Sequence, residues 1–346
     1  MGILRRYGKY LPVTKKTPLV NLEEGNTPLV RLERLGDELG IELWVKLEGC
    51  NPTGSFKDRG MVLAVAKALE DGARAIVCAS TGNTSASAAA YAAHVGIPCY
   101  VLLPSGHVAL GKLAQALIYG AKVISVEGNF DSALEMAREA SRKHGIAMVN
   151  SVNPYRIISQ KTGAWEICDT LGRVPDMHVL PVGNAGNISA YWAGYKNYRE
   201  WDKISSLPRM TGIQAAGAAP LATGKPCPNP ETIATAIRIG NPVSASTARE
   251  AVSESGGTFE TVTDDEILAA QSILASKSGI FAEPASCAAI AGLVKLKNSG
   301  RLPQGGTVAV ILTGNGLKDP DTAISQVAPP VKIGATMEEL TEALSL

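Results

Sequence analysis

The 346-residue chain lacks the cysteine and histidine patterns that build metal centres or disulfide frameworks. Its six cysteines are scattered, with no Cys-x-x-Cys pair and no histidine at ligand spacing. We therefore expect no metal site and no disulfide-stapled fold, and we expect Cys78 and Cys99 to be small core residues of strands. The four histidines form no constellation, so we expect surface or helix-end positions for His94, His107, His144 and His178.

Strong net charge and long apolar runs are also missing. Lysine and arginine total 33 against 32 for aspartate and glutamate, which leaves a formal charge of +1 and no basic run for nucleic acid. Glycine, serine or charged residues interrupt every apolar stretch well before the roughly 20 residues that a membrane helix needs. Residues 1–12 also lack the apolar centre of a signal peptide. We expect a soluble, cytoplasmic protein without nucleic-acid or membrane partners.

Apolar strand-like runs alternate with helical runs along most of the chain. This alternation is typical of an α/β fold with mainly parallel strands, and the length suffices for about two domains. The proline-rich segment 224–230 is predicted to be an irregular surface loop. Strands are predicted near residues 43–47, 75–79, 99–103, 122–126, 147–149, 178–182, 212–215 and 307–312.

Residues 52–60 read Pro-Thr-Gly-Ser-Phe-Lys-Asp-Arg-Gly and place Lys57 in the first turn of a helix. Ser55 is predicted to cap this helix, with Asp58 as the acidic partner of a capping box. At the positive end of a helix dipole the pKa of an ammonium falls, which an amine needs if it is to attack an aldehyde near neutral pH. An ordinary solvated lysine fits the same local sequence, so the rest of the chain must decide.

Three turns that contain Gly-Asn each follow a short apolar run, at residues 80–85, 183–187 and 313–316. A strand, a turn and then a helix form the arrangement in which phosphates and cofactors bind. In the second turn, two glycines allow successive N–H groups to converge on one anion. A plain turn with a capping asparagine explains 183–187 equally well when it is taken alone. Three such turns together with Lys57 indicate a cofactor site.

These motifs together resemble the tryptophan-synthase-like, fold-type II pyridoxal-phosphate enzymes, and among them most closely the threonine synthase family. The matching runs are Asn-Pro-Thr-Gly-Ser-Phe-Lys-Asp-Arg at 51–59, Ser-Thr-Gly-Asn-Thr-Ser-Ala-Ser at 80–87, Gly-Asn-Ala-Gly-Asn at 183–187 and Glu-Pro-Ala-Ser at 283–286. The likeness extends from about residue 24 to residue 318. Dehydratases of the same fold typically carry a glycine run at the phosphate loop instead.

The resemblance implies a fold and a domain organisation. It implies two open, mostly parallel, twisted sheets with helices on both faces and the cofactor in the cleft between two domains. A small domain at about 52–150 would be inserted into a large domain made of 1–51 and 151–346. Family likeness also implies a homodimer.

The resemblance further implies how pyridoxal 5'-phosphate is held. Lys57 would bind the cofactor covalently and then act as acid and base on the substrate carbon skeleton. Asn83 would bind the phenolic oxygen, and Thr313 would face the pyridine nitrogen. A hydroxyl cannot stabilise a protonated ring as a carboxylate can, so we expect a weaker electron sink than in aspartate-paired transaminases. The cofactor phosphate would lie on Gly183, Asn184, Ala185, Gly186 and Asn187.

The reaction that the resemblance implies is that of a lyase acting on O-phospho-L-homoserine, with water, to give L-threonine and phosphate. Arg156 can bind a phosphate dianion through two parallel hydrogen bonds, although a surface salt bridge is the simpler role for an arginine. The candidate ligands of the substrate phosphate are Ser151, Asn153 and Arg156, and those of its α-carboxylate are Ser80, Thr81, Asn83 and Thr84.

Three other functions remain open at this point. A serine or threonine dehydratase would share the lysine, the cofactor and the fold, but its substrate has no phosphate for Arg156. A dinucleotide-binding oxidoreductase is disfavoured because no Gly-x-Gly-x-x-Gly turn is followed by an acidic ribose partner. A non-catalytic amino-acid-binding module would have no need for Lys57.

Overall fold

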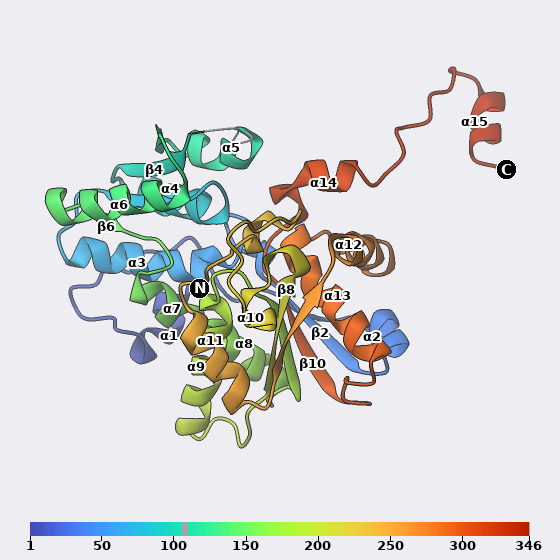
Figure 1. The fold of residues 1–346 in the computed structure, drawn as a ribbon, viewed down its shortest axis with the longest axis horizontal. Helices are drawn as coiled ribbons and strands as arrows, with labels where there is room; N and C mark the ends of the chain where they lie inside the picture. The colour runs from blue at the N-terminus through green and yellow to red at the C-terminus, as the bar shows by residue number, and fades with distance from the viewer. Residues whose placement is uncertain (106–109, 346) are drawn as a thin grey trace.

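The computed structural model describes residues 1–105 and 110–345 and has the α/β architecture that the sequence predicts (Figure 1). The described strands form a six-stranded sheet of order β1-β2-β10-β7-β8-β9 and a four-stranded sheet of order β5-β4-β3-β6. Within both sheets neighbouring strands are parallel, except for the antiparallel pair β1 and β2. The strands are β1 (Leu29–Arg31), β2 (Glu42–Leu47), β3 (Ile76–Ala79), β4 (Cys99–Pro104), β5 (Lys122–Val126), β6 (Ala147–Met148), β7 (Met177–Pro181), β8 (Arg209–Ala215), β9 (Thr258–Val262) and β10 (Thr307–Leu312).

All eight predicted strands are present, and the prediction missed two. The missed strands, β1 and β9, form the two edges of the six-stranded sheet, and most of their residues are only half-buried. An edge strand buries less apolar surface than a central one, so it leaves a weaker pattern in the sequence. Segment 224–230 follows a short helix that ends at Thr223 and is irregular, as predicted.

The four-stranded sheet has a helix layer on each face. Val77 and Ala79 of β3 pack in one core cluster with residues of α6, whereas Ile76 and Cys78 share the other cluster with α4. This alternation follows from the two-residue period of a strand. The helices of this half are α3 (Lys57–Glu70), α4 (Asn83–Val95), α5 (Leu110–Ile118) and α6 (Phe130–His144).

The six-stranded sheet is also covered on both faces (Figure 1). Helices α2, α12 and α13 pack with Val308 and Val310 of β10, and helices α8, α9 and α11 lie in the cluster of Ala309 and Ile311. The remaining helices are α1 (Ile3–Tyr7), α2 (Glu33–Leu39), α7 (Pro154–Gln160), α8 (Thr162–Leu171), α9 (Gly186–Glu200), α10 (Pro220–Thr223), α11 (Ala245–Glu254), α12 (Asp264–Ser278), α13 (Pro284–Asn298), α14 (Pro320–Ile324) and α15 (Met337–Ala343).

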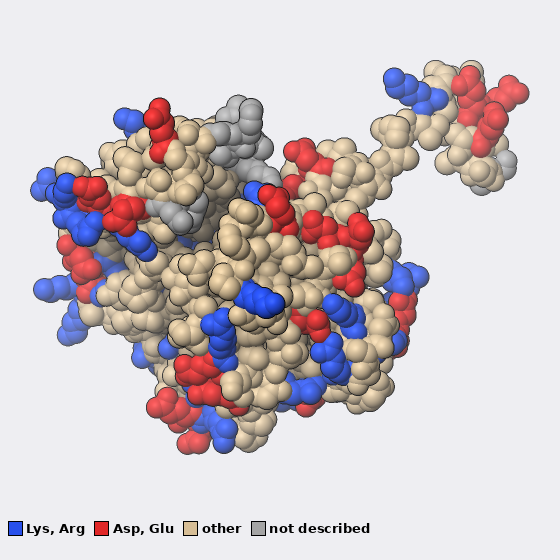
Figure 2. Space-filling model, viewed as in Figure 1, with Lys and Arg blue, Asp and Glu red and all other residues tan. Residues whose placement is uncertain are grey.

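The surface carries no single field of charge in the view of Figure 2, where basic and acidic side chains are interspersed. The C-terminal helix α15 projects from the body of the molecule at the end of an extended segment (Figure 1). Among the described residues, no helix combines the length and the apolar character needed to cross a membrane.

The predicted core positions of Cys78 and Cys99 are confirmed, and one histidine prediction is wrong. Cys78 and Cys99 are buried core residues of β3 and β4. His94 and His144 lie exposed in the last turns of α4 and α6, as predicted, whereas His107 lies outside the described residues. His178 is fully buried in β7, where its Nδ1 lies 2.9 Å from the hydroxyl of Tyr195 and burial lowers its pKa to about 3. It belongs to the core because a central parallel strand is buried on both faces.

Candidate active site

Lys57 is the first residue of helix α3, as the sequence predicts. Its Nζ lies 4.3 Å from the centre of the Phe56 ring. Burial of the amine, together with the charge of Arg156, lowers the pKa of Lys57 to about 7, against a smaller opposite effect of Glu283. The direction agrees with the prediction, but the main cause is desolvation and not the helix dipole. This shift favours the neutral amine far more than in an ordinary lysine at pH 7.

The predicted capping box is wrong. The residue that precedes α3 is Phe56, and no side chain caps the helix. The hydroxyl of Ser55 only accepts a long bond of 3.4 Å from the amide of Lys57. Asp58 instead accepts from the amide and the hydroxyl of Thr53, both at 2.7 Å, and from Ser87 Oγ at 2.6 Å. Asp58 thus fastens the loop before the lysine to α4.

One cavity brings most of the predicted site residues together. It contains Lys57 at its wall, the phosphate-loop candidates 183–187, and Thr313 at the end of β10. Ser151 and Arg156 line the same cavity. The lysine, both candidate anion-binding groups and the strand-end hydroxyl therefore face one small volume, although they are spread over more than 250 residues of sequence.

The loop 183–187 joins the end of β7 to the start of α9. Its left-handed turn is made by Ala185, with φ of 66°, and not by either glycine. Gly183 serves a different purpose, because a Cβ at this position would lie 2.9 Å from the Cα of Ile237. The loop is thus held close to the neighbouring segment, with a helix N-terminus at the cavity. Such a terminus presents free N–H groups and a positive partial charge to an anion.

Arg156 is buried, with 1% of its surface exposed. Its Nη1 donates to the carbonyl of Val149 at 2.8 Å, and its Nε has no partner in the described part of the chain. Among those residues no carboxylate lies within ion-pair distance of Arg156. Burial lowers its pKa to about 10, so it remains a cation at neutral pH. A buried, uncompensated cation is costly, and an anion in the cavity would compensate it.

Five predicted ligands do not line this cavity. Asn83 is one hydrogen bond away, since its Nδ2 donates to the cavity residue Glu283 at 3.0 Å. Asn153 caps α7: its Oδ1 accepts from the amide of Tyr155 and its Nδ2 donates to the carbonyl of Met148, each at 3.0 Å. The remaining three lie half-buried after β3 and in the first turn of α4, and they are Ser80, Thr81 and Thr84.

Two polar residues of the cavity were not predicted, namely Gln160 and Glu283. Gln160 is buried, and its Oε1 accepts from the Nδ2 of Asn187 at 3.2 Å. Glu283 is 4% exposed and accepts from Asn83 and from Thr313. The sequence offers two signals for Glu283: it begins the Glu-Pro-Ala-Ser run that matches the family, and it stands directly before Pro284, which opens helix α13. Neither signal gave it a role in the site.

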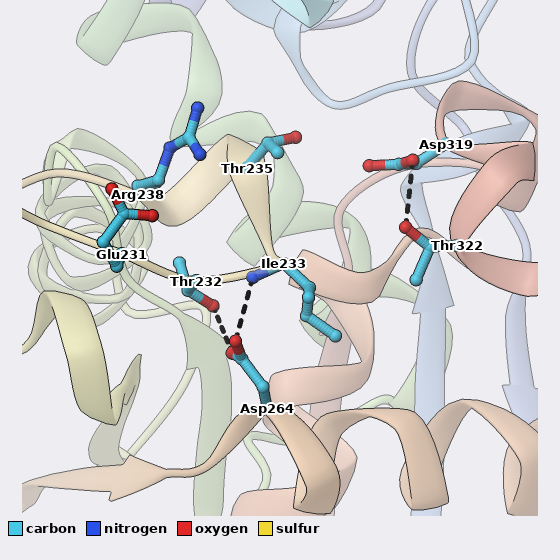
Figure 3. Close-up of a pocket in the computed structure, with 8 residues that line it drawn as sticks. All are labelled: Glu231, Thr232, Ile233, Thr235, Arg238, Asp264, Asp319 and Thr322. Atoms are coloured by element: carbon cyan, nitrogen blue, oxygen red, sulfur yellow. Dashed lines mark hydrogen bonds between the residues drawn. The ribbon is translucent and has the colours of Figure 1, made fainter. Parts of the chain in front are cut away.

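A second, larger hollow has a volume of about 410 Å³ and is lined by different residues (Figure 3). In it Asp264 accepts from the hydroxyl of Thr232 at 2.5 Å and from the amide of Ile233 at 3.1 Å. The same segment continues to Ala236 and Ile237, which line the lysine cavity. Asp264 therefore anchors one end of a segment that walls the site. The residues around this hollow are Glu231, Thr232, Ile233, Thr235, Arg238, Asp264, Asp319 and Thr322.

Comparisons with known proteins agree with this geometry. Residues 20–314 match the family described as pyridoxal-phosphate dependent enzyme. The threonine synthase of Halalkalibacterium halodurans is 60% identical over 94% of this chain and 92% of its own length. That of Mycobacterium tuberculosis H37Rv is 55% identical over 98% of this chain and 96% of its own.

Solved structures show the same fold at low identity. Maize serine racemase has a TM-score of 0.76 at 21% identity, covering 87% of this chain and 92% of its own. A processed threonine deaminase from Solanum lycopersicum has a TM-score of 0.73 at 21% identity, covering 86% of each chain. On the family match and the identity to these relatives together, the chain belongs to the threonine synthase family of pyridoxal-phosphate-dependent enzymes.

Proposed function

We propose that this enzyme converts O-phospho-L-homoserine and water into L-threonine and phosphate. The observation that carries the substrate assignment is Arg156, a buried cation without a described carboxylate partner in the cavity of Lys57. The loop 183–187 provides a separate anion site in the same cavity. A cavity with two anion sites suits a phosphorylated cofactor together with a phosphorylated substrate. The names of the relatives support the same reaction.

The residues present fit pyridoxal phosphate. The N-terminus of α9 offers backbone donors for its phosphate, and the buried amine of Lys57 has a pKa of about 7 that suits covalent attachment. We assign the phosphate to Gly183, Asn184, Ala185, Gly186 and Asn187, the phenolic oxygen to Asn83 and the pyridine nitrogen to Thr313. The cofactor, when bound, supplies an electron sink for negative charge at the substrate carbons.

The protein side chains then bind the substrate and move its protons. Lys57 takes the proton from the α-carbon, and a β-proton also leaves. Arg156 and Ser151 hold the phosphate while its bond to the γ-carbon breaks, with Asn153 placed behind them at the start of α7. Ser80, Thr81, Asn83 and Thr84 hold the α-carboxylate at the end of β3 and the start of α4.

Water completes the reaction at the β-carbon after the γ-carbon has been protonated. The oxygen of this water becomes the hydroxyl of threonine, and the departed phosphate keeps its ester oxygen. With a second pKa of about 6, the phosphate can accept the proton of the attacking water. Water must be excluded from the site before this step, because water that entered earlier would cause side reactions.

We further propose that residues 52–150 and residues 1–51 plus 151–346 are two domains that close on the substrate. The lysine cavity encloses only about 50 Å³, below the roughly 300–1,000 Å³ of typical ligand pockets, so ligands need an opening. Many side-chain hydrogen bonds cross between these parts of the chain. Those from Asn83 to Glu283 and from Lys318 to Gln115 join α4 and α5 to the C-terminal part of the large domain. We also expect a cytoplasmic location, as predicted from the sequence, and a homodimer, on family likeness.

A serine or threonine dehydratase of the same fold is the competing function. The deciding assay gives the purified enzyme with cofactor either O-phospho-L-homoserine, threonine or serine. We expect phosphate and threonine from the first substrate and only slow 2-oxoacid formation from the others. Fast 2-oxoacid formation from threonine or serine, without phosphate release from phosphohomoserine, would show a dehydratase.

A further inference from the structure

Glu283 contacts two of the proposed cofactor ligands at once. Its Oε2 accepts from the Nδ2 of Asn83 at 3.0 Å, and its Oε1 accepts from the Oγ1 of Thr313 at 3.1 Å. Asn83 begins helix α4, and Thr313 follows strand β10. A single buried carboxylate thus joins the side chains that we place at two polar positions of the cofactor ring.

A carboxylate only accepts hydrogen bonds, and this fixes what its two neighbours can do. Asn83 must turn its nitrogen toward Glu283, which leaves its second N–H for another acceptor. Thr313 has one hydroxyl proton and donates it to Glu283. Toward any further partner Thr313 can then only accept a hydrogen bond.

Ser286 keeps Thr313 in this position. Its Oγ lies 3.0 Å from the Oγ1 of Thr313 and accepts from the amide of Gly314 at 2.9 Å. Ser286 has a hydroxyl proton of its own to donate, whereas the carboxylate of Glu283 can only accept. An acceptor beside a ring nitrogen stabilises the protonated form of that nitrogen.

We propose that Glu283 acts through Thr313 to keep the pyridine nitrogen of the cofactor protonated. The proposal rests on the cofactor orientation given under the proposed function. It replaces the expectation that Thr313 makes the ring a weak electron sink. Because Thr313 donates its proton to the carboxylate of Glu283, its oxygen can accept a hydrogen bond from the protonated ring nitrogen. Glu283 is a positioning residue in this account, since it acts on the ring nitrogen through Thr313.

The groups around Glu283 act on its charge in opposite directions. Burial is the largest effect and raises its pKa, while hydrogen bonds from Asn83 and Thr313 and the charges of Lys318 and Lys57 partly oppose that rise. Lys57 comes from α3, and Lys318 from the short helix Gly316–Lys318. The two lysines favour the negative carboxylate, and burial keeps its field strong inside the cavity.

The test is the ¹⁵N NMR shift of the ring nitrogen in ¹⁵N-labelled pyridoxal phosphate bound to the full-length enzyme at neutral pH. We compare the wild type with Glu283→Gln, Thr313→Val and the matched surface control Glu139→Gln. The wild type and Glu139→Gln should show a protonated ring. Glu283→Gln and Thr313→Val should both move the signal to the frequency of the unprotonated ring, and the double variant should move it no further.

Each other outcome is decisive. An unprotonated ring in the wild type, or a protonated ring in Glu283→Gln, overturns the proposal. If Glu283→Gln does not bind cofactor, Thr313→Val decides, because the effect must pass through Thr313. Phosphate release from O-phosphohomoserine by the wild type is measured separately, so that failure of the proposed reaction is distinguished from failure of this inference.

Discussion

At the residue scale, the site is defined by two cations that share one buried cavity. Arg156 contributes to the lowered pKa of Lys57, and among the described residues neither side chain has a carboxylate within ion-pair distance. A cavity of this kind favours anions, and it favours a neutral amine at Lys57. The two side chains can be tested separately because their proposed tasks differ.

Replacing Lys57 by alanine should abolish threonine formation while the protein stays folded. Covalent attachment and proton transfer need the amine, whereas the loop 183–187 is a separate element and should still bind the cofactor weakly. Turnover, thermal unfolding and cofactor fluorescence measure the three parts of this prediction. Substantial turnover of phosphohomoserine by Lys57→Ala would remove the lysine from the mechanism.

Arg156→Ala should impair the phosphorylated substrate selectively. A charge-assisted pair on a phosphate contributes about 2–4 kcal/mol, so kcat/KM for phosphohomoserine should fall roughly 30- to 1,000-fold. Slow elimination from threonine or serine should be largely spared, since these substrates carry no phosphate. The exposed Arg209 provides the control, because Arg209→Ala should leave all activities unchanged. An equal loss of every activity in Arg156→Ala would show that the residue is structural.

At the element scale, helix α3 is held to the six-stranded sheet by a buried set of four charges. Arg59 lies two residues after Lys57, and it pairs with Glu48 at 2.7 Å and with Glu166 of α8 at 2.6 Å. Lys46 of β2 pairs with the same Glu166 at 2.8 Å. These four side chains are 2% exposed or less, so they fix the start of α3, and with it the catalytic lysine.

Removing one member of this set should be costly. Glu166→Gln leaves buried cations without their partner and should destabilise the protein by about 3–5 kcal/mol at pH 7. Burial alone would raise the pKa of Glu166, but Arg59 and Lys46 outweigh it and lower the pKa to about 2. Its stabilisation is therefore complete above its ordinary pKa near 4.5 and is lost as the pH falls toward 2.

Urea unfolding of the wild type and Glu166→Gln at a series of pH values tests this window. The difference in free energy of unfolding should narrow as the pH falls below 4.5. The surface variant Glu139→Gln, which removes an exposed pair with Lys143, should cost less than about 1 kcal/mol. A difference for Glu166→Gln that stays constant down to pH 3 would contradict the pKa assignment.

The phosphate loop makes a second prediction at this scale. Gly183→Ala would place a Cβ 2.9 Å from the backbone of Ile237, so the loop must shift at a cost of about 1–3 kcal/mol. Cofactor affinity should fall roughly 5- to 150-fold, measured by titration of the apoenzyme. Gly8→Ala is the control, because only Val13, at 4.0 Å, lies near the added methyl group and the site is remote. Unchanged cofactor binding in Gly183→Ala would place the cofactor phosphate elsewhere.

At the scale of the whole molecule, the sequence predicts every central strand of the two described sheets and the lysine that begins α3. Apolar runs fix these elements because both faces of a parallel sheet are buried. The edge strands β1 and β9 could not be predicted, since their pattern is weak. The left-handed turn at Ala185 was also missed, because a residue with a Cβ adopts it only when the surrounding structure enforces it.

The site residues that the sequence did not reveal are those whose role depends on tertiary contacts. Glu283 meets Asn83 across 200 positions of sequence, and no local spacing encodes that meeting. The buried state of Arg156 likewise depends on Gly60, where a Cβ would lie 2.7 Å from the Nε of Arg156. Sequence motifs identify the chemical groups, but the fold determines which of these groups lie in the same cavity.

The measurement that tests the central claim most directly is turnover of O-phospho-L-homoserine by the holoenzyme in ¹⁸O-labelled water. The account predicts equal amounts of threonine and phosphate, with one ¹⁸O in the threonine hydroxyl and none in the phosphate, because the carbon–oxygen bond breaks and water adds to the β-carbon. Homoserine together with ¹⁸O-labelled phosphate would mean that the phosphorus–oxygen bond breaks instead, and would contradict the account.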